Sequence, residues 1–75
     1  MDVVIPSGLL GDEDEGELTE WLVADGAHVD AGQDLVCIET AKVSVNLESP
    51  AAGTISCVAE AGALVQGGTV VATLS

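Results

Sequence analysis

The chain has 75 residues, with thirteen Asp and Glu against a single Lys or Arg, and a formal net charge of −12. Proteins that bind nucleic acid or anionic membranes neutralise phosphates with clustered Lys and Arg, so this composition excludes both kinds of partner. No run approaches the roughly 18 apolar residues of a membrane span, and the N-terminus lacks the basic region of a signal peptide. We therefore expect one small domain, residues 1–75, located in the cytoplasm.

The apolar residues suit a sheet. Val, Leu and Ile supply 22 residues, eleven of them Val, and Ala supplies ten more, whereas Trp21 is the single aromatic residue. This content argues against disorder, and β-branched residues favour strands over helices. The core is therefore expected to be aliphatic.

Strands are predicted along the whole chain. Period-2 alternation is clearest over residues 43–48, and turn-forming glycines and prolines separate the apolar runs. No window shows a sustained 3.6-residue period with helix caps, so the fold is predicted to be all-β. The predicted strands are 2–6, 17–24, 27–30, 34–40, 43–48, 54–61, 63–66 and 70–74, with residues 8–16 as a loop between the first two.

The spacing of glycine and aliphatic residues also repeats. Five positions recur 36 residues later, in the pairs Gly26/Gly62, Val29/Val65, Gly32/Gly68, Leu35/Val71 and Ile38/Leu74. One repeat cannot bury its own apolar face. Two repeats are therefore expected to pair into a quasi-two-fold sandwich, with four strands from each half forming two small antiparallel sheets.

The one lysine lies between the two repeats. Thr40 ends the first and Val43 begins the second, so Ala41 and Lys42 form the tip of a predicted tight hairpin. Two interpretations are open at this point. Lys42 is either a solvated turn residue that relieves repulsion between nearby carboxylates, or an exposed amine that a modifying enzyme acylates, so that the domain carries a group between distant sites.

The residues around Lys42 resemble the lipoyl and biotinyl carrier domains. The segments IETAKV (38–43) and ESPAAGTI (48–55) carry the resemblance, and glycine and aliphatic positions on both sides match the family's spacing over nearly the whole chain. The resemblance implies a flattened eight-stranded barrel-sandwich, with two four-stranded antiparallel sheets and quasi-two-fold symmetry. It also implies that Lys42, at a hairpin tip, is the covalent attachment site of a prosthetic group.

The neighbours of Lys42 bear on which group is attached. Biotinyl domains typically place Met on both sides of the lysine, and lipoyl domains typically place Asp before it and Ala after it. The neighbours here are Ala41 and Val43, which departs from both patterns. The segment ETAK nonetheless resembles a lipoyl variant of some 2-oxoacid dehydrogenase acyltransferase components. Lipoic acid on Lys42 is therefore predicted, with biotin as the alternative.

The resemblance implies a carrier that is not itself an enzyme. After attachment by a lipoate ligase or lipoyl transferase, the lipoyl group on Lys42 would act as a swinging arm in a 2-oxoacid dehydrogenase complex. It would carry acyl groups and electrons between a thiamin-dependent 2-oxoacid decarboxylase, an acyltransferase catalytic domain and a dihydrolipoamide dehydrogenase. Tethering brings the group to each site at high effective concentration.

The whole chain is expected to be the N-terminal module of a dihydrolipoamide acyltransferase, monomeric when isolated. Two alternatives stay open. One is a biotin carboxyl carrier domain, and the other is an unmodified barrel-sandwich that serves assembly.

Recognition by modifying and partner enzymes is assigned to residues that flank the lysine and to the first loop, which the resemblance places beside the hairpin. The assigned residues are Glu39, Thr40, Ala41, Val43, Leu9, Leu10, Gly11 and Asp12. One of the two leucines is expected to pack against the barrel and the other to touch a partner. A solvated acidic turn is the alternative for this loop.

No metal or catalytic site is predicted. Residues 12–15 lack the alternating ligands of a calcium loop, and His28 has no Cys or His at ligand spacing. Cys37 and Cys57 are predicted to be buried apolar residues, and Trp21 is predicted to pack in or over the core.

Two hypotheses account for the acidity. Complementarity to basic surfaces of partner enzymes would speed encounter, whereas adaptation to high salt would relieve the self-repulsion of the domain. The near-total loss of Lys and Arg favours the salt hypothesis, because docking needs only a local patch.

Overall fold

A computed structural model describes residues 1–11 and 13–75. It contains eight strands, in agreement with the eight predicted segments. They are β1 (Asp2–Val4), β2 (Glu15–Trp21), β3 (His28–Val29), β4 (Asp34–Glu39), β5 (Ser44–Glu48), β6 (Gly53–Cys57), β7 (Leu64–Gln66) and β8 (Val70–Leu74). Within these described ranges, no helix is long and apolar enough to cross a membrane.

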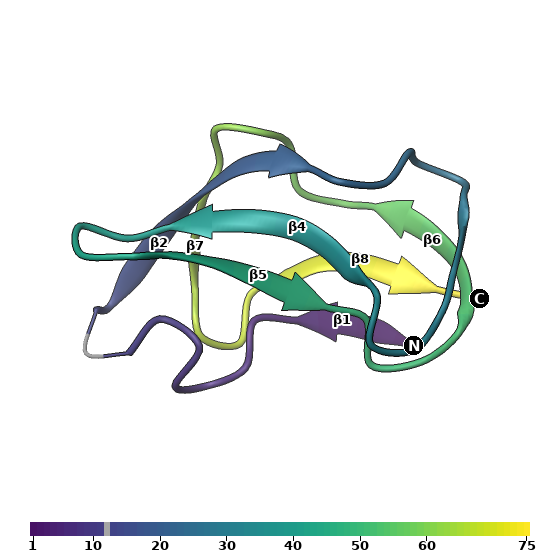
Figure 1. Cartoon of the computed structure of the whole chain (residues 1–75), viewed down its shortest axis with the longest axis horizontal. Helices are drawn as coiled ribbons and strands as arrows, with labels where there is room; N and C mark the ends of the chain where they lie inside the picture. The colour runs from purple at the N-terminus through teal and green to yellow at the C-terminus, as the bar shows by residue number, and fades with distance from the viewer. Residues whose placement is uncertain (12) are drawn as a thin grey trace.

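The strands form two four-stranded antiparallel sheets, ordered β1-β8-β6-β3 and β5-β4-β2-β7 (Figure 1). Exchanging each strand for the one four places along the chain converts the first sheet into the second. This relation confirms the predicted all-β barrel-sandwich with quasi-two-fold symmetry.

The repeated glycines build the same turn twice. Gly26 and Gly62 have φ angles of +88° and +94°, a left-handed conformation that side chains with a Cβ rarely adopt. The Gly26 N–H donates to the Ile55 carbonyl at 2.7 Å, and the Gly62 N–H donates to the Leu18 carbonyl at 2.6 Å. Since Leu18 and Ile55 occupy matching places in β2 and β6, the sequence repeat corresponds to a repeat in hydrogen bonding.

The core is aliphatic, as predicted, and draws on both sheets. Alternating strand residues turn inward, and the largest fully buried side chains are Ile5, Leu18, Leu35, Ile38 and Ile55. Trp21 is half-buried and packs against this cluster. Its Nε1–H donates to the Ala59 carbonyl at 3.0 Å, which satisfies the polar edge of the ring. The expectation that Trp21 packs over the core is therefore met.

Several strand bounds differ from the prediction, among them the start of β2 and the end of β6. β2 begins at Glu15, two residues early, because Glu15 and Gly16 pair with β7, so the predicted loop over 8–16 is wrong at its end. β6 ends at Cys57 because the N–H groups of Val58 and Ala59 both donate to the Val71 carbonyl, so the regular pairing with β8 does not continue.

The two cysteines also differ from the prediction. Cys37 and Cys57 are half-buried rather than fully buried, and both are free thiols. Cys37 lies in β4 between the buried residues Val36 and Ile38, whereas Cys57 ends β6 between the exposed residues Ser56 and Val58.

The ends of the chain and the lysine hairpin lie at opposite ends of the long axis (Figure 1). The Met1 amino group donates to the Leu74 carbonyl at 2.8 Å, which joins β1 to β8 beside the C-terminus. The β4–β5 hairpin extends at the other end. The fold therefore keeps the hairpin away from both termini.

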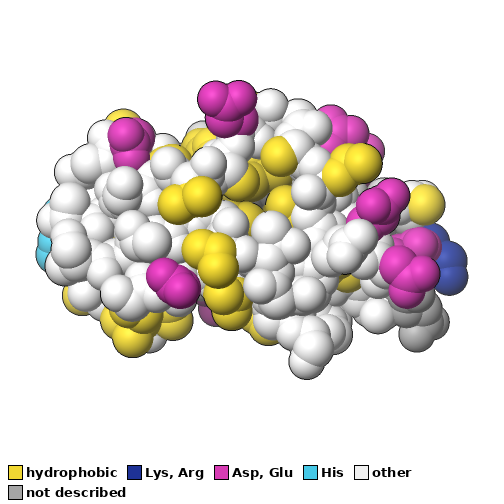
Figure 2. All heavy atoms as spheres, turned by 180° about the vertical axis from the view of Figure 1, so that it is seen from behind, with side chains coloured by type: hydrophobic (Ala, Val, Ile, Leu, Met, Phe, Trp, Pro, Cys, Tyr) yellow, Lys and Arg dark blue, Asp and Glu magenta, His cyan; other side chains and the backbone are white. Residues whose placement is uncertain are grey.

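Acidic side chains face one another across two strand pairs. Glu17 lies opposite Glu39 in β2 and β4, and Asp34 lies opposite Glu48 in β4 and β5. Like charges in such cross-strand pairs are destabilising. Among residues 1–11 and 13–75, the one ion pair is His28 Nε2 with Asp30 Oδ1 at 3.5 Å, and both side chains are exposed. Figure 2 shows acidic side chains spread over one face with few cations to offset them.

We expect added salt to stabilise the domain. Between 0.1 and 1 M KCl the screening length falls from about 10 to about 3 Å, and the melting temperature should rise by roughly 5 °C or more. The double variant Glu17→Gln/Glu48→Gln breaks both like-charged pairs and should show a smaller rise. A melting temperature that is independent of KCl would contradict the stabilisation of the domain by charge screening. It would also contradict the hypothesis of adaptation to high salt, which stays a prediction.

Candidate attachment site

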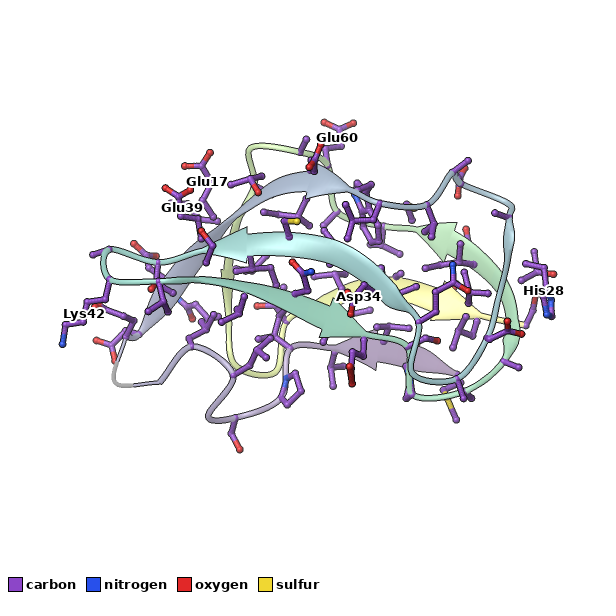
Figure 3. The ribbon with its side chains drawn as sticks, viewed as in Figure 1. Glu17, His28, Asp34, Glu39, Lys42 and Glu60 are labelled. Atoms are coloured by element: carbon purple, nitrogen blue, oxygen red, sulfur yellow. The ribbon has the colours of Figure 1, made fainter. Side chains whose placement is uncertain are left out.

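Lys42 occupies the tip of the hairpin between β4 and β5, as predicted. Its side chain is exposed and points away from the body of the domain, whereas His28 lies at the opposite end (Figure 3). Within the described part of the chain, no carboxylate lies within the 4.0 Å of an ion pair with Lys42. The amine is therefore accessible to an enzyme and is not held in a salt bridge.

Thr40 closes the hairpin below the lysine. The Thr40 N–H donates to the Val43 carbonyl at 2.8 Å, and the Thr40 hydroxyl donates to the same carbonyl at 3.1 Å. The hydroxyl oxygen accepts the N–H of Lys42 at 3.3 Å and that of Val43 at 3.1 Å. The two residues at the tip, Ala41 and Lys42, are thus carried on a turn that one side chain organises.

The base of the hairpin packs tightly against the start of β2. A Cβ added at Gly16 would lie 2.8 Å from Ile38 Cγ2, 3.2 Å from the Glu39 carbonyl oxygen and 3.2 Å from Leu10 Cδ2. Glycine is therefore required here by close approach, not by its φ angle. The first loop and the hairpin meet at this point.

The first loop is the main departure from two-fold symmetry near the site. It runs over residues 5–14, whereas the matching connection between β5 and β6 runs over 49–52. Leu10 is buried in the core with 5% exposure, and Leu9 is half-buried at the edge of the core. The expectation that one leucine packs against the barrel is met by Leu10. Gly11 is exposed, and Asp12 lies outside the described residues.

The residues that flank the lysine fall into two groups. Glu39, Ala41 and Val43 are exposed, and Val43 retains 52% of its accessible surface, so all three can touch an enzyme bound at the tip. Thr40 is 8% exposed and acts within the hairpin. Because Thr40 and Leu10 are buried, they can affect recognition only indirectly, by positioning their exposed neighbours.

A groove of about 390 Å³ lies beside the hairpin. It brings the predicted residues Glu39, Thr40 and Ala41 together with Glu13, Glu15 and Gly16 of the predicted first loop. Glu17 and Leu64 also line it, and sequence reasoning missed both. Glu17 and Glu39 lie side by side on one face of the hairpin base (Figure 3). Leu64 is 66% exposed, and it reaches this face because β7 pairs with β2.

A second groove, of about 350 Å³, is lined by Trp21, Cys57 and neighbouring residues. Burial raises the pKa of the Cys57 thiol above its ordinary value of 9.0, and the Asp25 carboxylate raises it further. A raised pKa leaves less thiolate at neutral pH, so Cys57 is not an activated nucleophile. In the described residues, no group of three or more His, Cys, Asp or Glu is placed to hold a metal ion.

Comparison with known proteins identifies the family. The family model described as "Biotin-requiring enzyme" (Biotin_lipoyl) matches residues 3–74. The chain belongs to the biotin/lipoyl carrier-domain family. Members of this family bind their cofactor covalently and are carriers rather than catalysts themselves. The family resemblance identified in the sequence is thereby confirmed.

Two proteins of known kind are similar to this chain, one in sequence and one in structure. Acetyl-CoA carboxylase 2 of Oryza sativa subsp. japonica is 44% identical over 69 residues, which is 92% of this chain but 3% of that protein. The solution structure of the lipoyl domain of the 2-oxoglutarate dehydrogenase complex from Azotobacter vinelandii superposes with a TM-score of 0.74 at 24% identity, covering 100% of this chain and 96% of that one. The second relative confirms the fold.

Proposed function

We propose that Lys42 is the attachment site of a lipoyl group, and that the domain carries this group between the active sites of a 2-oxoacid dehydrogenase complex. The observation that carries the proposal is the placement of the chain's single lysine. It stands exposed at a hairpin tip, in a carrier-domain family, at the end of the fold remote from both termini. No other side chain offers an amine.

The residues around Lys42 fit such a group. Joining the lipoic acid carboxyl carbon to Lys42 Nζ forms an amide with overall loss of water, and it changes the formal net charge from −12 to −13. Lys42 makes no ion pair with a described residue that attachment would have to break. When bound, the group supplies acyl-transfer and redox chemistry. The domain itself contributes a firm base for the arm, a soluble surface and the exposed side chains that enzymes recognise.

Two observations support lipoyl over biotin. The segment ETAK resembles a lipoyl variant, and neither neighbour of Lys42 is the Met typical of biotinyl domains. The full-length superposition on a lipoyl domain supports the fold, which the resemblance gives to lipoyl and biotinyl domains alike, so it does not bear on this choice. The identity with a carboxylase favours the alternative, a biotin carboxyl carrier domain. An unmodified assembly module is a further alternative, against which the exposed lysine argues.

The proposed partners follow from the lipoyl group. They are the lipoate ligase or lipoyl transferase that attaches it, a thiamin-dependent 2-oxoacid decarboxylase, an acyltransferase domain and dihydrolipoamide dehydrogenase. The A. vinelandii relative is named as part of a 2-oxoglutarate dehydrogenase complex. We extend this to the present chain as a proposal, including its association with an acyltransferase and a cytoplasmic location.

The deciding experiment is intact mass spectrometry after separate incubation with a lipoate ligase plus lipoic acid and with a biotin protein ligase plus biotin, each with ATP. We expect a single mass increase equal to one lipoyl group in the first reaction and none in the second. A biotin adduct alone would replace the proposal with the carboxyl-carrier alternative. If neither ligase modifies a correctly folded domain, the carrier proposal itself is wrong.

A further inference from the structure

The Thr40 hydroxyl organises the backbone that carries the lysine. We propose that Thr40 is a positioning residue, which presents the Lys42 amine to the modifying enzyme by fixing the hairpin tip. This inference rests on the proposed function of Lys42 and extends it to the question of how the amine is held. It assigns Thr40 a role inside the hairpin instead of a contact with the enzyme.

The contacts of Thr40 set it apart from its neighbours. Its side chain is 8% exposed, whereas the three residues that follow are all exposed. Its hydroxyl donates to the Val43 carbonyl and accepts the N–H groups of Lys42 and Val43. Within the described part of the chain, no other side chain hydrogen-bonds to the backbone of residues 41–43. The hydroxyl therefore uses its one hydrogen and both lone pairs on the tip.

The turn depends on this hydroxyl because of the backbone φ angles of the two tip residues. Tight two-residue hairpins favour turns whose central residues have positive φ, as Asn-Gly supplies. Neither Ala41 nor Lys42 has a positive φ. The Val43 N–H consequently bonds to the Thr40 hydroxyl, while the Thr40 N–H keeps its bond to the Val43 carbonyl at 2.8 Å. The side chain closes a turn that the sequence Ala-Lys does not favour.

Loss of the hydroxyl would loosen the tip without emptying the core. The N–H groups of Lys42 and Val43 would turn to water, and the tip would sample several conformations. If the enzyme binds only one of these conformations, only a fraction of the domain molecules can bind at any moment. The apparent affinity of the enzyme for the domain is then reduced by that fraction. The effect should appear in KM for the domain, while kcat at saturation changes little.

Three variants test the role of Thr40. Thr40→Val keeps the shape of the side chain and removes the hydroxyl, whereas Thr40→Ser keeps the hydroxyl. The control, Thr19→Val, removes a different hydroxyl, which donates to the carbonyl of Cys37 in β4 at 3.2 Å, outside the hairpin tip. Amide hydrogen exchange at Lys42 and Val43 should accelerate about tenfold in Thr40→Val. In Thr40→Ser and Thr19→Val, the exchange rates should stay within about twofold of those of the parent sequence. KM in the lipoate ligase reaction should rise about tenfold in Thr40→Val, with kcat within about twofold.

Two readouts separate this inference from the proposed function. Equal exchange rates in Thr40→Val and Thr40→Ser overturn the role of Thr40, whatever group Lys42 carries. If exchange changes but KM does not, the hydroxyl holds the turn without presenting the amine, and the inference is also overturned. A parent domain that no ligase modifies refutes the proposed function instead. Should Thr40→Val not fold, Thr40→Ala replaces it in the same comparison with Thr40→Ser.

Discussion

Replacing Lys42 with arginine should abolish the mass increase completely, with no loss of folding. The arginine guanidinium stays protonated at any usable pH, so it offers no free amine to an activated carboxyl group. The substitution keeps the positive charge and the net charge of −12. Because the side chain is exposed and makes no ion pair with a described residue, its loss should leave the melting temperature unchanged within about 1 °C.

The measurement is intact mass after ligase treatment of the parent and of Lys42→Arg, with urea unfolding of both as the check on folding. Because the sequence contains a single lysine, loss of the mass increase in Lys42→Arg assigns the modification to that side chain. A mass increase that persists in Lys42→Arg would place the modification elsewhere. It would also remove the basis for any role of the hairpin in carrying a group.

The features that sequence alone predicted are those determined by residues close together in the chain. Period-2 alternation gave the strands, and the repeated glycine spacing gave the two-fold relation of the sheets, since Gly26 and Gly62 need a left-handed φ wherever the turn occurs. The hairpin tip followed from the position of Lys42 between two repeats. In each case the residue types carry the physical cause within a few positions of the chain.

The features that sequence did not predict depend on contacts between distant segments. β2 starts early because it pairs with β7, and the same pairing places Leu64 beside the lysine hairpin. The predicted strand over 54–61 was too long because apolar residues continue past Cys57 while their backbone partners do not. Composition shows which residues tend to form a strand, but strand pairing decides where the strand stops.

Thr40 illustrates the same limit at the site itself. Its assignment as a recognition residue came from its place next to the lysine, and proximity in sequence does not distinguish a contact with an enzyme from a contact within the turn. The structure separates the two, because Thr40 is nearly buried and bonds to Val43 while Glu39 is exposed. The useful signal in the sequence was the absence of Asn-Gly at the tip, which left a turn in need of another hydrogen-bond acceptor.

A methyl group at Gly16 should destabilise the domain by about 1–3 kcal/mol, although Gly→Ala within a strand is ordinarily favourable by roughly 0.5–1 kcal/mol. The reversal of sign follows from close packing. The new Cβ would meet Ile38 Cγ2 at 2.8 Å, and Ile38 is a buried β-branched residue with little freedom to move. The backbone oxygen of Glu39 stands 3.2 Å away on another side. Either the hairpin base or the first loop must shift.

Gly67→Ala is the matched control, because its added Cβ would come no closer than 3.8 Å to another residue and Gly67 does not have a positive φ. Urea unfolding should show a midpoint about 1 M or more lower for Gly16→Ala, and an unchanged or slightly higher midpoint for Gly67→Ala. Equal midpoints would mean that the contact between the first loop and the hairpin is loose. A tight contact has a functional consequence, since the segment that carries Leu10 is then held against the base of the hairpin that presents Lys42, and an enzyme approaching the lysine meets both as one surface.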